Sequence, residues 1–212
     1  MKTPDHALRL IEAVVNAVDV PITLKTRLGW DEDLLNAPDI ARRAEAAGIQ
    51  MITIHGRTRC QFYKGRANWR AIARVKDAVR IPVIANGDIT CVRSAQTALA
   101  QSGADGVMVG RGAQGQPWLL AGISHVIYGT AAPDVPEGAA LADLVERHYE
   151  EMLRFYGADL GARVARKHLG WYMDSAGTLP DVRRALLTAK SPQAARPLIR
   201  QAMMATAQQV AA

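Results

Sequence analysis

The fold is decided by the stretch Ile81-Pro-Val-Ile-Ala-Asn-Gly-Asp88, whose pattern recurs in Ala104-Asp-Gly-Val-Met-Val-Gly-Arg111. Each stretch is a short apolar run, rich in β-branched residues, that ends at glycine and polar residues. This pattern is typical of a fully buried strand followed by a loop. Two consecutive strands that end in this way predict a rim of backbone amides and charge that is suited to phosphate.

The composition fits a chain that buries a real core, because 49% of its 212 residues are apolar and 22% are charged. Length alone allows one large domain or two modest ones. The net charge of +6 and the pI near 9.6 indicate either a polyanionic partner or merely a soluble basic enzyme.

Two features of the composition bear on compartment and metal. Cys60 and Cys91 have no CxxC partner, so we expect neither a disulfide framework nor a metal site, and the reducing cytoplasm is the predicted location. No apolar run is long enough to span a membrane, so no membrane association is expected.

The first part of the chain alternates between helical and extended patterns. Strands are expected over 21–27, 51–55, 82–85 and 106–109. Helices are expected over 5–18 and from Pro38 to Gly48. Three more helices are expected, one with Asn68 as its N-cap, one that begins at the N-cap Thr90 and ends at Gly103, and one that begins at Pro117. This order indicates βαβ units and a parallel sheet.

Two parallel architectures compete for this part of the chain, the open doubly wound sheet and the (β/α)8 barrel. No strand runs into a G-x-G-x-x-G fingerprint, and barrels bind phosphate in the loops after their last two strands. The barrel is therefore favoured. Since four strands are half of such a barrel, the predicted fold is the C-terminal half of a (β/α)8 TIM barrel followed by a small all-α helical bundle.

The composition changes at a stretch rich in proline and glycine, which predicts a partial barrel over 1–128, a linker over 129–140 and a helical domain over 141–212. The helices of that domain are expected over 141–156, 160–175, 180–189 and 192–209. Residues 160–212 carry eight Lys and Arg against two Asp, which indicates a docking surface for an anion.

Two residues near strand ends could carry chemistry. Lys25 alternates with Leu24, so the two side chains face opposite sides of the strand, and Lys25 either meets an anionic cofactor or substrate or snorkels to the rim. His55 ends the second strand, where barrel active sites collect, and is either functional or structural.

The loops add a basic segment and the phosphate cradle. Arg57, Arg59, Lys64 and Arg66, with two aromatic residues among them, form either a solvated loop or a basic rim able to stack on bases. Cys60 could be a nucleophile, but nothing adjacent in sequence would activate it, so a structural or incidental residue is favoured. The residues that could hold a phosphate are Asn86, Gly87, Asp88, Gly110 and Arg111, although Asp88 could instead cap the following helix.

The motifs Ile52–Arg59, Ile81–Ile89, Gly106–Trp118 and Arg166–Tyr172 resemble the bacterial tRNA-dihydrouridine synthase family, most closely its B-type subgroup. The resemblance implies an FMN-containing TIM barrel followed by a helical tRNA-binding domain. It also implies that NADPH reduces the flavin, which passes a hydride to C6 of a tRNA uridine, while a cysteine on a barrel loop protonates C5.

The resemblance assigns expected roles to residues of this chain. Lys25 would contact the flavin ring, and His55 would lie near the flavin or the target uracil. The FMN phosphate would be held by Asn86, Gly87, Asp88, Gly110 and Arg111. The tRNA phosphates would be met by Arg57, Arg59, Arg163, Arg166 and Lys167.

The family's first half-barrel and its catalytic cysteine loop have no counterpart in this sequence, so no catalytic residue is expected here. We expect a C-terminal portion that binds FMN weakly, has no synthase activity alone, and needs the missing half-barrel or an oligomeric partner to cover its sheet. The alternatives are a flavin-dependent barrel oxidoreductase acting on a free pyrimidine and a non-catalytic tRNA-binding remnant. A basic bundle suits a tRNA partner and is not needed for a free pyrimidine.

Overall fold

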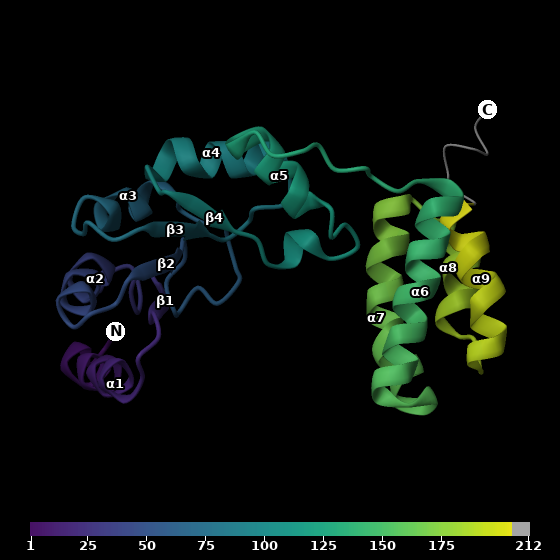
Figure 1. The fold of residues 1–212 in the computed structure, drawn as a ribbon, viewed down its shortest axis with the longest axis horizontal. Helices are drawn as coiled ribbons and strands as arrows, with labels where there is room; N and C mark the ends of the chain where they lie inside the picture. The colour runs from purple at the N-terminus through teal and green to yellow at the C-terminus, as the bar shows by residue number, and fades with distance from the viewer. Residues whose placement is uncertain (205–212) are drawn as a thin grey trace. The chain divides into compact units, whose positions relative to one another are not determined.

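The computed structural model describes residues 1–204, which form two compact units (Figure 1). The first unit comprises Met1–Gly112 and Val126–Gly129, and the second comprises Ala113–His125 and the chain from Thr130 onward. Residues 113–125 therefore group with the later helices, whereas the predicted domains place them with the sheet. The packing of Trp118 against the helical core accounts for this grouping. The domain division at 129–140 stays a prediction.

The first unit is an α/β fold with a parallel sheet, as the sequence predicts. Its four strands are ordered β1-β2-β3-β4, and every neighbouring pair is parallel. The elements in chain order are α1 (Pro4–Ala17), β1 (Thr23–Arg27), α2 (Ala37–Ala46), β2 (Met51–His55), α3 (Arg70–Lys76), β3 (Val83–Asn86), α4 (Val92–Ser102) and β4 (Gly106–Met108).

The two faces of this sheet differ in polarity because side chains alternate along each strand. Ile52, Ile54, Val83 and Ala85 are fully buried, and they form one core with residues of α2 and α3. Figure 1 shows α2 and α3 on one side of the strands. The opposite face carries polar and charged residues, which are described below.

The start of α4 differs from the prediction. Cys91, not Thr90, is the N-cap, and its Sγ accepts the Ser94 N–H at 3.4 Å while Ser94 Oγ accepts the Cys91 N–H at 3.0 Å. The prediction was wrong because this reciprocal pairing requires a partner three residues on, and Ser94 supplies it for Cys91. The end of α4 is as predicted, since Gly103 adopts the left-handed conformation there.

The second unit is helical. It contains most of α5 (Leu119–Tyr128), which follows the short 3-10 helix η1 (Arg111–Ala113), and then α6 (Gly138–Tyr156), α7 (Ala158–Ala176), α8 (Pro180–Leu187) and α9 (Pro192–Met204). The predicted helix over 192–209 extends into residues 205–209, which lie outside the described residues. Among the described residues, no helix is both long and apolar enough to cross a bilayer.

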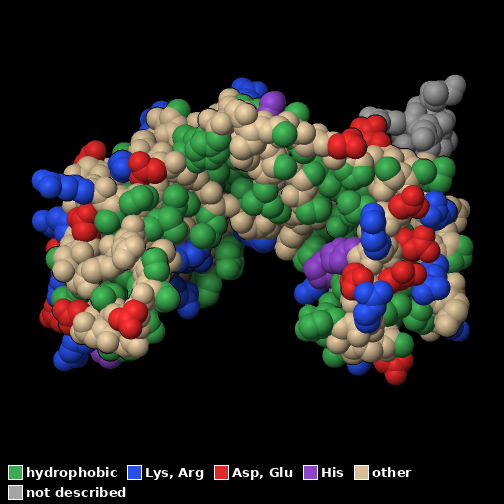
Figure 2. Space-filling view, in the orientation of Figure 1, with side chains coloured by type: hydrophobic (Ala, Val, Ile, Leu, Met, Phe, Trp, Pro, Cys, Tyr) green, Lys and Arg blue, Asp and Glu red, His purple; other side chains and the backbone are tan. Residues whose placement is uncertain are grey.

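Helices α6, α7, α8 and α9 share one apolar core, and their outer surface is covered by ion pairs. Figure 2 shows acidic and basic side chains side by side on this unit. Arg196 pairs with Glu150 at 3.2 Å, and Arg200 pairs with Asp143 and Glu146. Exposed pairs of this kind contribute little to stability, so the apolar core holds the helices together.

Gly161 fixes how closely α7 approaches α6. A Cβ at this position would lie 2.7 Å from the Met152 carbonyl oxygen, which is far inside van der Waals contact. Gly170, further along α7, lacks this constraint, because its nearest neighbour would be the flexible Arg183 guanidinium at 3.4 Å.

We expect Gly161→Ala to destabilise the protein by about 1–3 kcal/mol, because the clash with α6 backbone outweighs the better helix propensity of alanine. Gly170→Ala is the matched control and should be neutral or stabilising by up to about 1 kcal/mol. Urea denaturation followed by circular dichroism measures both variants. Equal midpoints for the two would contradict the close approach of α6 and α7.

Candidate functional site

The polar face of the sheet gathers the residues that the sequence singles out. The strand register aligns Arg27 with His55, His55 with Asn86, and Asn86 with Met108, so these residues stand in one row at the carboxyl ends of the strands. Lys25 stands one step earlier on the same face, since it is two residues before Arg27. Lys25, His55 and Asn86 therefore lie on the same face of the sheet.

An ion pair between the buried Arg57 and the partly exposed Asp88 joins the loops that follow β2 and β3. Arg57 donates to both Asp88 oxygens at 2.9 and 2.7 Å and to the carbonyl oxygens of Gly65 at 2.7 Å and Lys64 at 3.1 Å. The side chain of Arg57 is only 3% exposed. Asp88 also accepts the Ala67 N–H at 2.7 Å. Arg57 was predicted to meet tRNA, but its guanidinium is occupied inside the protein and acts as a support.

The carboxylate of Asp88 is likewise occupied. Burial pushes its pKa up, but hydrogen bonds from the Ala67 N–H and from Arg57 outweigh this effect and hold the pKa below its ordinary value. Asp88 adopts a φ of 55°. It does not cap α4, which Cys91 caps. Asp88 therefore shapes the predicted phosphate cradle and offers a ligand no free carboxylate.

Gly87 is a glycine because His55 packs against it. Its φ is 110°, and a Cβ there would lie 2.6 Å from His55 Cδ2 and 2.9 Å from Ala67 Cβ. The Gly87 carbonyl accepts the Trp69 indole N–H at 2.8 Å. The turn after β3 thus holds the imidazole ring of His55 from beneath.

His55 is neutral at neutral pH. It is 8% exposed, and burial together with the positive charges of Arg27, Lys25 and Arg57 lowers its pKa to about 4, against a smaller opposing effect of Asp88. The Arg57 Nη1 lies 3.3 Å from His55 Nε2. Because arginine can only donate, Nε2 is the acceptor and the proton of the neutral ring lies on Nδ1. His55 can therefore donate one hydrogen bond from Nδ1, which has no partner among the described residues.

Positive charge gathers at this face. Lys25 is exposed. Its pKa is lowered mainly because part of its side chain is buried, and also because the positive charge of Arg27 repels it. Arg27 donates to the carbonyl oxygens of Thr58 at 2.8 Å and Phe62 at 2.7 Å. Sequence reasoning missed Arg27, although it lies two residues beyond Lys25 and therefore on the same side of the strand.

Tyr63 lies beside two cations that come from different segments of the chain. Its ring has the guanidinium of Arg27 at 5.5 Å and that of Arg111 at 4.7 Å, both within the range of cation–π contact. Arg111 follows β4 and Tyr63 lies in the loop after β2, so the contact draws distant segments together. The predicted rim residue Arg111 thus lies near the face that carries Lys25 and His55.

The predicted rim also contains accessible backbone. Nothing lies within 4 Å of the position of a Cβ on Gly110, so this segment is open to a ligand. Gly112 is tightly packed instead, since its Cβ would lie 2.1 Å from the Ile89 carbonyl oxygen. The side-chain nitrogen Nδ2 of Asn86 donates to the Met108 carbonyl oxygen at 2.8 Å. The side-chain oxygen of Asn86 takes no part in this bond. The loops after β3 and β4 thus pack together.

The other predicted residues are exposed. Arg59 lies over the ring of Phe62 at 4.2 Å, and Cys60 has an exposed thiol. Arg163, Arg166 and Lys167 are exposed on α7, in the second unit. Among the described residues no three His, Cys, Asp or Glu side chains are grouped as metal ligands would be.

The first unit is thus a parallel α/β sheet whose polar face carries positive charge and whose strands β3 and β4 are followed by glycine-containing loops. The chain belongs to the dihydrouridine synthase family, whose model, described as dihydrouridine synthase (Dus), matches residues 1–209. The resemblance read from the motifs is therefore confirmed.

Curated relatives agree with this assignment. The chain is 62% identical over 202 residues to a probable tRNA-dihydrouridine synthase of Rhodobacter capsulatus, covering 95% of this chain and 62% of the relative. A probable tRNA-dihydrouridine synthase of Rhizobium leguminosarum bv. phaseoli is 53% identical, with 91% and 59% covered. The tRNA-dihydrouridine synthase B of Xanthomonas campestris pv. campestris is 44% identical, with 94% and 60% covered. The chain spans about three-fifths of the length of these relatives.

Among solved structures, a mandelate oxidase mutant is 19% identical and aligns with a TM-score of 0.34, covering 91% of this chain and 67% of that one.

Stability should depend on pH through His55. Because its folded pKa of about 4 lies below the ordinary value of 6.5, the unfolded chain binds a proton between these pH values that the folded chain does not. The free energy of unfolding is therefore highest above pH 6.5 and falls as the pH falls toward 4. Urea denaturation across this range should show the slope, and His55→Gln should flatten it. His6→Gln, at an exposed position on α1, is the control, and a flattening there instead would refute this origin.

Proposed function

We propose that this chain forms the cofactor-phosphate and tRNA-binding portion of a flavin-dependent tRNA-dihydrouridine synthase that uses NADPH to reduce uridine to 5,6-dihydrouridine. One observation carries the proposal. This chain belongs to the dihydrouridine synthase family, and its Lys25, His55 and Asn86 share one face of the sheet, next to the segment of Gly110 and Arg111. The relatives' names supply the substrate, and the sheet face supplies the place for the cofactor.

The rim fits the phosphate end of FMN. A phosphate monoester carries a charge near −2, and it would meet the open backbone at Gly110 together with the guanidinium of Arg111. Arg57 and Asp88 neutralise each other, so the net positive charge of the face comes from Lys25, Arg27 and Arg111. Asn86 and Gly87 would shape the cradle from the end of β3.

Two residues of the face would orient the flavin ring and the uracil. Bound FMN would supply the hydride chemistry, with NADPH as the source of electrons. Lys25 would place a cation beside the ring and favour its anionic reduced form. Neutral His55 would donate a hydrogen bond from Nδ1, and it would keep this role at every pH above about 4. Cys60 and Cys91 are both exposed and receive no catalytic role in this proposal.

The sheet would be half of a (β/α)8 barrel. Helices cover its apolar face, as they do on the outside of such a barrel, and the polar face would point to the interior. Further strands or a partner chain would cover the interior side. A cytoplasmic location is part of the same proposal, since it places the enzyme with its tRNA substrate.

The helical unit would bind tRNA. Arg163, Arg166 and Lys167 are exposed on α7 and offer charge to phosphates, and Arg59 offers charge from the loop after β2. An oxidoreductase for a free pyrimidine would not need this basic bundle, so the tRNA substrate is preferred.

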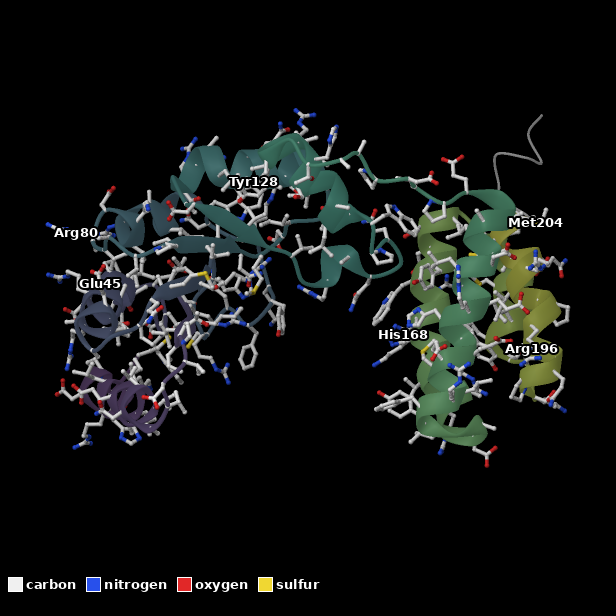
Figure 3. All side chains as sticks on the ribbon, viewed as in Figure 1. Glu45, Arg80, Tyr128, His168, Arg196 and Met204 are labelled. Carbon is white, nitrogen blue, oxygen red and sulfur yellow. The ribbon has the colours of Figure 1, made fainter. Side chains whose placement is uncertain are left out.

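We expect Lys25→Ala and Arg111→Ala each to weaken FMN binding about tenfold, because each removes one charge-assisted contact. Titration of FMN into the full chain, followed by flavin fluorescence, measures the affinity. Arg80→Ala is the matched control and should leave it unchanged, since Arg80 lies before β3 at the opposite edge, where its N–H donates to Glu45 at 2.9 Å (Figure 3). A wild-type chain that binds no FMN would refute the cofactor proposal.

Arg57 and Arg59 should differ in what they affect. Arg57→Ala is expected to destabilise the fold by about 1–3 kcal/mol, because it removes a buried side chain and leaves the partly exposed Asp88 carboxylate without its partner. Arg59→Ala should leave the melting temperature unchanged and weaken tRNA binding, since its guanidinium is exposed. Thermal melts and a gel-shift assay with an unmodified tRNA transcript separate the two. An Arg57→Ala variant of native stability would contradict the supporting role.

A further inference from the structure

The helical unit contains a cavity of about 400 Å³ that the proposed cofactor site does not use. It lies between the beginning of α7, the end of α8 and the beginning of α9, with Tyr149 of α6 at its wall. Leu169, Leu186 and Ala195 give it an apolar floor, and each of them is buried. The volume is in the range of pockets that take small organic ligands.

The rim of the cavity is basic. Arg163, Arg166 and Lys190 line it, and none of the three has an ion-pair or hydrogen-bond partner among the described residues. Asp159 also lines the cavity and contributes one negative charge. By contrast, Arg196 on the outer surface, labelled in Figure 3, is paired with Glu150. Unpaired cations around a concave surface attract an anion.

Tyr149 presents its hydroxyl to the cavity. It is only 2% exposed and lines the cavity, yet its hydroxyl has no hydrogen-bond partner among the described residues. Burial raises its pKa, although the charges of Arg196 and Arg166 oppose the shift, so the hydroxyl keeps its proton. The hydroxyl of Tyr172, by contrast, is paired with His148 at 3.2 Å. A ligand oxygen in the cavity would accept a hydrogen bond from the Tyr149 hydroxyl.

The amino end of α9 opens on the same cavity. Ser191 and Pro192 line it, and the Ser191 hydroxyl accepts the Ala194 N–H at 3.2 Å. A helix of 13 residues carries partial positive charge at this end, which favours an anion there. The helix end thus adds to the field of the three side chains.

We propose that this cavity binds one phosphorylated nucleotide of an RNA strand. The phosphate lies on the rim formed by Arg163, Arg166 and Lys190, the Tyr149 hydroxyl donates to a ligand oxygen, and the nucleoside packs against the apolar floor. This inference rests on the proposed function for its choice of RNA. It goes further by naming Tyr149 and Lys190, which place the contact in a cavity instead of on an open surface.

The test measures binding of a fluorescein-labelled oligouridylate to the full chain by anisotropy at several salt concentrations. Arg166→Ala and Lys190→Ala should each weaken binding about tenfold and lower the slope of log affinity against log salt by about one. Tyr149→Phe keeps the ring in the core and should weaken binding about fivefold, with an unchanged melting temperature. Arg147→Ala is the matched control, because Arg147 is exposed on α6 in the same unit but does not line the cavity.

Competition identifies the bound part of the RNA. Uridine 5′-monophosphate should displace the oligonucleotide from the wild-type chain more effectively than uridine or inorganic phosphate does, and Tyr149→Phe should reduce this advantage. Equal losses for Arg147→Ala and the cavity variants, or no loss for any of them, would overturn the cavity proposal. Wild-type RNA binding that persists in that case would leave the tRNA function standing. Cavity-dependent binding of oligouridylate without binding of a tRNA transcript would instead refute the proposed function.

Discussion

The buried pairing of Arg57 with Asp88 is the interaction on which the site depends. A guanidinium that is almost fully removed from water is tolerable only when its donors are satisfied, and here both Asp88 oxygens and two carbonyl groups satisfy them. To reach Arg57, the chain turns sharply after β3, with positive φ at Gly87 and Asp88. That turn supports the ring of His55, so one ion pair fixes the geometry at two strand ends.

The same pairing determines the electrostatics of the face. Asp88 cancels the charge of Arg57, and the remaining cations, Lys25 and Arg27, together with burial keep His55 uncharged. A neutral imidazole next to two cations can donate a hydrogen bond without adding to their repulsion. The helical unit repeats the principle with a neutral Tyr149 hydroxyl beside unpaired arginines. In both places a neutral hydrogen-bond donor lies beside positively charged side chains.

The spacing of apolar residues, and the glycine and proline residues between apolar segments, predicted the parallel sheet, the strand β2 over 51–55 and the end of α4 at Gly103. Contacts between distant segments could not be predicted in this way. Arg57 begins a basic run, which suggested a surface role, and only the turn at Asp88 reveals its burial. The cavity beside Tyr149 likewise requires four helices to meet, and no local pattern marks that meeting.

The division of the sheet into an apolar and a polar face has an evolutionary consequence. Residues that hold the helices, such as Ile52 and Ile54, alternate with residues such as Thr53 and His55 that face the proposed ligand. Selection for folding and selection for ligand preference therefore act on different positions of the same strand. Descendants of this sequence could change what they recognise through single substitutions on one face, while the packing of the other face is inherited intact.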